Sequence, residues 1–145
     1  MRSLKQHTVI IFWILIGVFL FVVGQLCIPA IRDLLKGSEL FLIPMGIFCL
    51  FGLTLLVLAL KEKIGGKIRK FLILTGASAT GLFVFVLLHN FTYGLFIYLF
   101  GQNFWLRIGL SDEPVFFLLA IVVCPIGFLV GTIGTIVLFI KGRRN

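Results

Sequence analysis

The longest charge-free stretch of this sequence runs from Phe71 to Leu106 without an Asp, Glu, Lys or Arg. The hydrocarbon core of a bilayer, about 30 Å thick, is crossed by about 20 helical residues, and two crossings would need about 40. The stretch therefore predicts one membrane-spanning helix with residues to spare, which we place at about residues 71–100. At about 45 Å this helix must tilt, bend or protrude. Gly94 and Gly101 are the candidate break points.

Three further apolar runs, at about residues 8–28, 40–60 and 115–140, are each long enough for one crossing. Charged residues make up 12% of the chain, against about 25% in a soluble domain. The first run exceeds the core of about 7–15 residues that a signal peptide has, so we expect it to be retained. The sequence thus predicts an all-α protein, a single four-helix transmembrane bundle over residues 1–145. Pro125 lacks an N–H and predicts a kink in the fourth helix.

The basic residues indicate which way round the bundle sits. The N-terminus, the turn around Gly65–Gly66 and the C-terminus hold 10 of the 13 Lys and Arg residues. Four crossings put these three segments on one side, and the positive-inside rule makes that side cytoplasmic. Both termini are therefore predicted to be cytoplasmic. The basic residues of the middle turn are expected to anchor on acidic lipid head groups, with a specific anionic ligand as the alternative: Lys61, Lys63, Lys67, Arg69 and Lys70.

The net charge of +8 does not by itself indicate nucleic-acid binding. Its basic residues form short clusters between apolar runs, without a basic face or an aromatic stacking platform. We therefore expect membrane lipids, and no nucleic acid, as partners of the basic residues.

His89 is an ionisable side chain well inside a long apolar stretch. It lies about 27 Å along its helix from Phe71, in the outer half of the bilayer or at its outer boundary. His89 and Tyr93 share one helix face, and polar groups facing lipid cost free energy, so this face should turn inward. We expect Gln25, at a similar depth in the first helix, as the partner of His89, with Asn90 as a second amide.

These four residues predict either a buried polar knot that fixes helix register or a pocket for a small ligand or lipid head group. A lone imidazole is a poor site for a metal or haem, and His7 lies at the opposite edge of the membrane. A proton relay lacks an Asp or Glu within a predicted span. Asp112 and Glu113 follow Ser111 and precede Pro114, so capping of the fourth helix accounts for them.

Small residues recur four apart in the third and fourth predicted helices. This spacing lets helix backbones approach closely, within one molecule or between subunits. The residues that we expect to pack the helices are Gly76, Gly81, Gly127 and Gly131. Cys49 and Cys124 fall at similar depths, which leaves a disulfide open as an alternative to two small apolar side chains.

The run Leu74–Tyr93 followed by Asp112–Phe117 resembles uncharacterised small four-helix membrane proteins of bacteria and archaea, over the C-terminal half of the chain. The resemblance implies a prokaryotic plasma membrane and no particular chemistry. Because the sequence offers no nucleophile–base pair and no metal cluster, we expect no enzymatic activity and no cofactor. We expect a small structural or accessory subunit that packs against another membrane protein or its own copies. The alternative is a small transporter or ligand-binding protein with a pocket near His89.

Overall fold

The computed structural model describes residues 6–35, 42–62 and 65–144, and every regular element within them is a helix. The elements are α1 (Gln6–Cys27), α2 (Pro29–Leu35), α3 (Ile43–Lys61), α4 (Gly66–Phe100), α5 (Phe104–Arg107), α6 (Pro114–Leu118), the π-helix η2 (Leu119–Val123) and α7 (Cys124–Arg144). Four stretches are long and apolar enough to cross a membrane: Gln6–Gln25, Ile43–Lys61, Gly66–Phe100 and Pro114–Gly142. The predicted all-α class and its four membrane-length helices are confirmed.

The third predicted helix is longer than expected and unbroken. α4 has 35 residues, about 52 Å at 1.5 Å per residue. Gly94, a predicted break point, lies inside the helix, whereas Gly101 ends it with a φ of +91°. A positive φ is readily adopted by glycine, which carries no Cβ. The Gly101 N–H still bonds the carbonyl of Ile97 at 2.9 Å, so the last turn is closed before the chain turns away.

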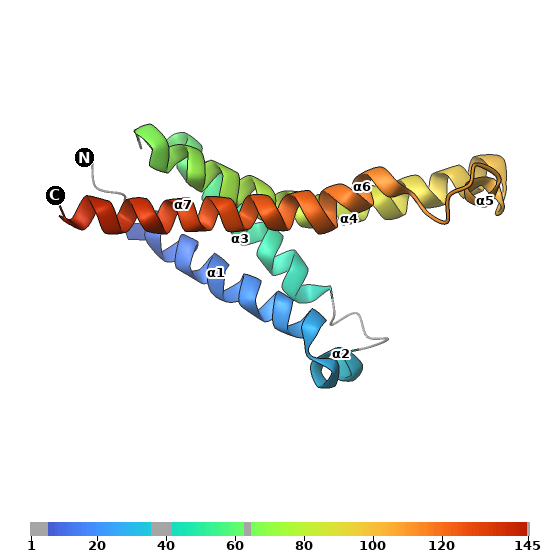
Figure 1. Cartoon of the computed structure of the whole chain (residues 1–145), viewed down its shortest axis with the longest axis horizontal. Helices are drawn as coiled ribbons and strands as arrows, with labels where there is room; N and C mark the ends of the chain where they lie inside the picture. Colours follow the sequence, from blue (N-terminus) through green and yellow to red (C-terminus); the bar gives the residue numbers. More distant parts are fainter. Residues whose placement is uncertain (1–5, 36–41, 63–64, 145) are drawn as a thin grey trace.

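Pro125 is accommodated by a π turn. The N–H of Cys124 reaches back five residues to the carbonyl of Leu119, within the wider turn of η2. Such a π turn shifts the hydrogen-bond register just where proline removes a donor. Figure 1 shows α6, η2 and α7 continuing as one rod without a sharp bend, so the predicted kink at Pro125 is wrong: the wider turn of η2 accommodates the proline instead.

α4 packs between α3 on one side and α7 on the other, and α1 packs on α3. The contact with α3 is very close at two glycines. A Cβ built on Gly76 would lie 2.8 Å from the N atom of Leu56, and one built on Gly52 would lie 2.9 Å from the N atom of Thr80. Gly76 therefore faces α3, and Gly52 is a packing glycine that the sequence analysis did not select.

The other predicted packing glycines lie between α4 and α7. A Cβ on Gly131 would lie 2.8 Å from the N atom of Thr75, and one on Gly127 would clash with the side chain of Ser78. Gly81 faces the sulfur of Cys124, which would lie 3.1 Å from an added Cβ. Gly127 and Gly131 therefore lie close against α4 within one molecule, while Gly76 has a different partner helix.

The two cysteines at similar depth flank α4 and do not meet. Cys49 of α3 lies with its sulfur 3.9 Å from the carbonyl oxygen of Thr80, and Cys124 of α7 lies beside Gly81. Both are free thiols. α4 separates them, so the disulfide that the sequence left open is excluded by geometry.

The core forms where α1, α3, α4 and α7 meet. Phe19, Phe48 and Phe128 pack there in tilted and edge-to-face contacts, with ring centroids 4.4 Å apart for Phe19–Phe128 and 5.2 Å apart for Phe48–Phe128. Closer to the chain termini, Phe12 of α1 meets Phe139 of α7 at 5.9 Å. These contacts join α1 to the α4–α7 pair over the N-terminal part of α1.

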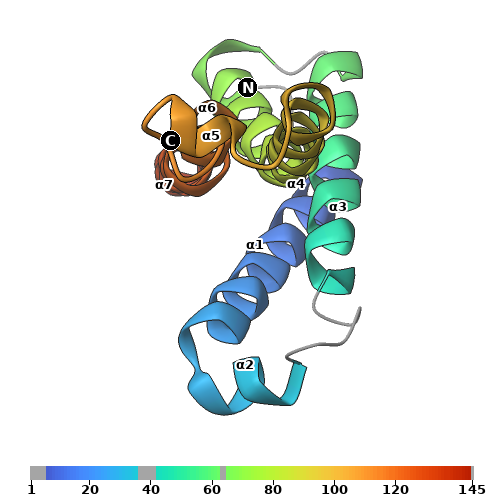
Figure 2. The same ribbon diagram turned by 90° about the vertical axis from the view of Figure 1, so that its right-hand side faces the viewer.

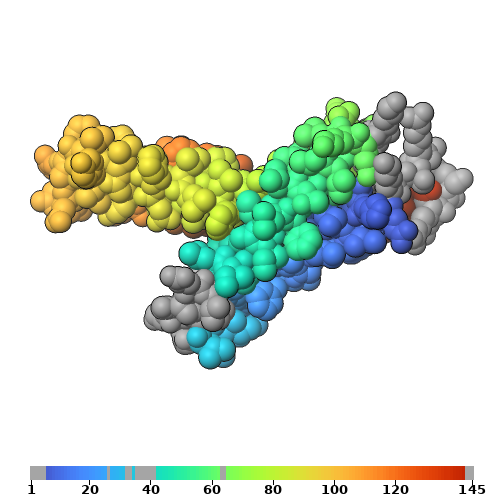
Figure 3. All heavy atoms as spheres, turned by 180° about the vertical axis from the view of Figure 1, so that it is seen from behind, coloured from blue at the N-terminus to red at the C-terminus, as the bar shows by residue number. Residues whose placement is uncertain are grey.

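The helices separate toward the opposite end of the molecule. The beginning of α1, the end of α3, the beginning of α4 and the end of α7 lie together at one end, as Figure 1 shows. At the other end α4, α5 and α6 extend as a slender projection, whereas α1, α2 and the start of α3 diverge from it. Figure 3 shows open space between these two parts. We call the projection the arm: α4 from Val84 to Phe100, with α5 and α6.

Candidate functional site

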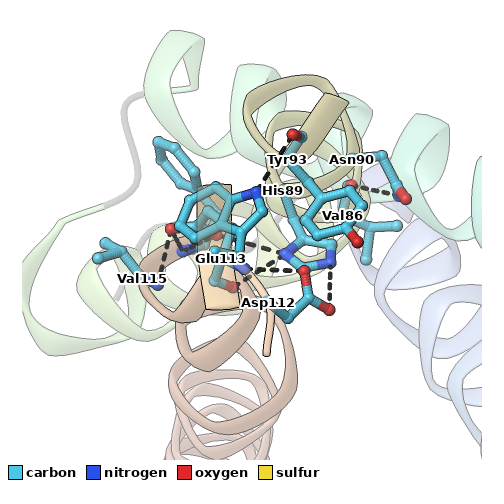
Figure 4. A network of polar contacts seen from close by, with 9 residues as sticks. Val86, His89, Asn90, Tyr93, Asp112, Glu113 and Val115 are labelled. Atoms are coloured by element: carbon cyan, nitrogen blue, oxygen red, sulfur yellow. Dashed lines mark hydrogen bonds and ion pairs between the residues drawn. The ribbon is translucent and has the colours of Figure 1, made fainter. Parts of the chain in front are cut away.

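His89 lies between two carboxylates at the base of the arm. Its Nδ1 is 3.1 Å from the carbonyl oxygen and 3.3 Å from Oε2 of Glu113, and its Nε2 is 3.5 Å from Oδ2 of Asp112. Figure 4 shows the imidazole lying against both acidic side chains. The contacts tie the middle of α4 to the first residues of α6.

The local fold places Glu113 by capping α6. Its Oε1 accepts hydrogen bonds from the N–H groups of Val115 at 2.7 Å and Phe116 at 3.2 Å, and its Oε2 accepts from Phe116 at 3.0 Å. Pro114 occupies the first helical position, where its missing N–H costs nothing. Capping was predicted for this segment, and the side chain that caps α6 is that of Glu113.

Burial differs sharply across the cluster. The Glu113 side chain is 5% exposed, His89 15% and Asp112 49%. Glu113 is therefore the buried member, stabilised by the N–H groups of α6 and the positive end of the helix dipole. Asp112 faces outward, and its Oδ1 accepts the N–H of Glu113 at 2.7 Å. Both imidazole nitrogens can donate to these acids at once only when the ring carries two protons.

Aromatic rings enclose the cluster. Phe117 and Tyr93 lie with ring centroids 5.6 Å and 6.5 Å from His89. Trp105 of α5 stacks on Tyr93 at 5.9 Å and donates its Nε1–H to the Tyr93 carbonyl at 3.4 Å. Trp105 is 6% exposed, so it packs on α4. The arm is thereby held at two levels, by the His89 contacts and by this aromatic stack.

Two of the four predicted site residues meet in this cluster and two do not. His89 and Tyr93 belong to it. Asn90 points away from His89, as Figure 4 shows, and donates to the carbonyl of Val86 at 2.8 Å. Gln25 is buried near the end of α1, and Figure 1 shows this end lying away from the arm. The acids of the α6 cap take the place that the sequence analysis gave to Gln25.

Sequence reasoning missed Asp112, Glu113 and Trp105 as members of the site. A usable signal was present, because two antiparallel helices bring together residues that lie equally far along the chain from the middle of their connection. In agreement with this rule, Phe85 and Phe116 stack with ring centroids 6.2 Å apart. One helical turn closer to the connection, His89 meets Glu113. The acids had been assigned to capping alone.

Of the five predicted lipid anchors, one has a structural role. Arg69 donates from Nε to the carbonyl of Ala59 at 3.2 Å and from Nη2 to that of Leu60 at 3.3 Å. It therefore caps the C-terminal end of α3. Lys61, Lys67 and Lys70 are exposed and free to meet head groups, and Lys63 lies outside the described residues.

The cluster is arranged for electrostatic attachment of one helix to another. Among residues 6–35, 42–62 and 65–144, no group of three or more His, Cys, Asp or Glu side chains is placed to hold a metal ion. The nitrogens of His89 and the oxygens of Glu113 are already engaged within the chain.

Comparison with known proteins finds no matching family model, no matching curated protein and no matching solved structure. The fold therefore defines only a broad class, an all-helical protein with four helices long and apolar enough to cross a membrane. The resemblance to small prokaryotic four-helix membrane proteins stays a prediction.

Proposed function

We propose that this protein is a small multi-pass subunit of a prokaryotic plasma membrane, with both termini in the cytoplasm. In this proposal it packs against another membrane protein or against its own copies, and it has no enzymatic activity and no cofactor. The orientation is supported by the described helix ends: the beginning of α1, the end of α3, the beginning of α4 and the end of α7 lie at one end of the molecule (Figure 1), and the basic residues concentrate in and next to these parts of the sequence.

The apolar surface of the arm is the observation that carries the proposal. About 20 residues cross the hydrocarbon core, so an upright α4 that enters at Lys70 leaves it near Asn90. Beyond that depth Tyr98, Leu99 and Phe100 are 85%, 58% and 52% exposed. The usual tilt of about 20° shortens a 52 Å helix by only about 3 Å along the membrane normal. These side chains therefore lie at or beyond the boundary.

Leaving such side chains in water is unfavourable. Burial of a large apolar side chain is worth about 1.5–3 kcal/mol, and α5 and the following turn add Leu106 and Ile108, which are 70% and 52% exposed. Exposed apolar patches of this kind mark surfaces that contact other proteins or membranes. An arm held rigid by the His89 cluster is suited to present that surface to a partner.

The alternative role, a transporter or ligand-binding protein with a pocket at His89, has less support. The imidazole nitrogens are occupied by Glu113 and Asp112, and the rings of Phe117 and Tyr93 lie beside the imidazole. This arrangement favours the register-fixing knot over an open pocket.

Mild purification from the native membrane tests the proposal. We expect the chain to migrate as a complex, with copies of itself or with a second membrane protein. A monodisperse monomer without a companion would contradict the accessory role. The orientation is tested separately by placing a cysteine at Lys67 in a variant whose three native cysteines are replaced by serine, and labelling intact cells with an impermeant reagent. Labelling from outside the cell would overturn the cytoplasmic assignment of the α3–α4 turn.

A further inference from the structure

One face of the arm is the continuation of the α4 face that contacts α3. Near its start, α4 meets α3 through Gly76 and Thr80, where the two backbones nearly touch. A helix repeats every 3.6 residues, so the same face returns further along α4 at three- and four-residue steps. The residues on this continuation are Leu87, Asn90, Phe91, Gly94 and Tyr98, which we call the arm stripe.

The arm stripe is uncovered within the described residues. Leu87, Phe91 and Tyr98 are 54%, 67% and 85% exposed. A Cβ added to Gly94 would meet nothing within 4 Å. α3 and α1 diverge from the arm here (Figure 1), and by helix periodicity the stripe lies opposite Phe85 and His89, which contact α6 and its cap. The face of α4 that α3 covers near Gly76 is therefore uncovered along the arm.

Asn90 sets this face apart from an ordinary lipid-facing surface. Its side chain is exposed, and among the described residues its one hydrogen bond runs from Nδ2 to the Val86 carbonyl at 2.8 Å. The amide oxygen and the second N–H remain available. Amide side chains in membrane helices bond across helix–helix contacts, and a small residue such as Gly94 one turn away permits close approach.

We propose that the arm stripe forms an interface with a second copy of this chain. The inference rests on the function proposed above and names the partner. An amide is both donor and acceptor, so two Asn90 side chains can satisfy each other across a twofold axis, as an isologous interface requires. Two copies inserted in the membrane in the same orientation have parallel arms. A twofold axis along the membrane normal then brings the same residues of both copies together at the same depth.

Site-specific photocrosslinking tests the partner. A benzophenone amino acid is placed at Leu87, on the stripe, or at Leu88, one residue on and about 100° around the helix. Full-length protein in native membranes is irradiated and the adducts are sized. We expect an adduct of twice the chain mass from position 87 and none from position 88.

The other outcomes separate the two proposals. An adduct with a different protein from position 87 overturns the second copy and leaves the accessory function standing. Adducts with lipid alone from both positions overturn both proposals. Equal adducts of twice the mass from both positions overturn the assignment of the face.

Asn90 variants test the amide pair. We expect Asn90→Leu to weaken self-association about tenfold, as measured by energy transfer between labelled copies in bilayers, because two interhelical hydrogen bonds are lost. Asn90→Gln should restore most of the affinity. Thermal stability should be unchanged, since the side chain is exposed. An unchanged affinity in Asn90→Leu overturns the pairing of the amides.

Discussion

His89 and Glu113 are 24 residues apart in the chain and connect two helices through a single ring nitrogen, Nδ1, which lies 3.3 Å from Oε2 and 3.1 Å from the carbonyl oxygen. The same carboxylate caps α6 through the N–H groups of Val115 and Phe116. One acidic side chain therefore starts a helix and fastens it to α4. Glu113 therefore joins the start of α6 to the arm helix α4.

The first prediction concerns this double role. Glu113→Ala should destabilise the protein more than His89→Ala, because it removes the cap, worth about 0.5–2 kcal/mol, as well as the contact with the imidazole. The free energy of unfolding in detergent is the measurement. The double variant should cost less than the sum of the single variants, with a coupling of about 0.5–3 kcal/mol. Additive effects would mean that the two side chains do not interact.

Asp112→Asn serves as the control for that prediction. Its carboxylate is half exposed and 3.5 Å from the imidazole, a geometry for which ion pairs contribute about 0–1 kcal/mol. The amide oxygen of Asn can still accept the N–H of residue 113. A loss of stability as large as that of Glu113→Ala would contradict the assignment of the buried acid as the main partner.

Gly52 gives the second prediction. A methyl group at this position would lie 2.7 Å from the Cβ of Ala79 and 2.9 Å from the backbone N of Thr80. The backbones must separate to admit it, so Gly52→Ala should lower the free energy of unfolding by about 1–3 kcal/mol. Gly17→Ala is the matched control, because a Cβ there meets nothing within 4 Å. It should be neutral or stabilise the helix by up to about 1 kcal/mol.

Arg69 and Lys70 give the third prediction, since they are neighbours with different roles. Arg69 bonds the carbonyls of Ala59 and Leu60 at the end of α3, whereas Lys70 is exposed. Arg69→Ala should lower stability by about 1 kcal/mol, the net worth of a typical hydrogen bond. Lys70→Ala should leave stability unchanged and should weaken binding to anionic vesicles. Equal stability losses would contradict the capping role.

Much of the fold was predictable from the sequence because apolar run length is a strong signal. The runs around Phe12, Phe48 and Phe128 are long enough to cross a bilayer, and each forms a helix in the structure. The continuity of α4 at Gly94 was not predictable. A glycine permits a break without requiring one, and in apolar surroundings every unmet backbone group is costly.

The site was predictable only in part, because polar partners depend on tertiary register. His89 stood out as a polar side chain in an apolar run, but its partner follows from how tightly α4 and α6 turn back on each other. The sequence favoured Gln25 as the partner of His89 because both lie at a similar depth in the membrane. That criterion ignores which helices are neighbours. Gly52 was missed because its close contact with α4 depends on where the two helices cross.

The two tryptophans give the last prediction, because the structure places them in different surroundings. Trp13 on α1 is 52% exposed within an apolar span, whereas Trp105 is 6% exposed and stacks on Tyr93. Trp105→Phe leaves only Trp13, and Trp13→Phe leaves only Trp105. Lipids with brominated acyl chains quench tryptophan on contact, so Trp13 should be quenched strongly and Trp105 weakly. Strong quenching of Trp105 would instead place it among the acyl chains and would mean that α5 does not fold back onto α4.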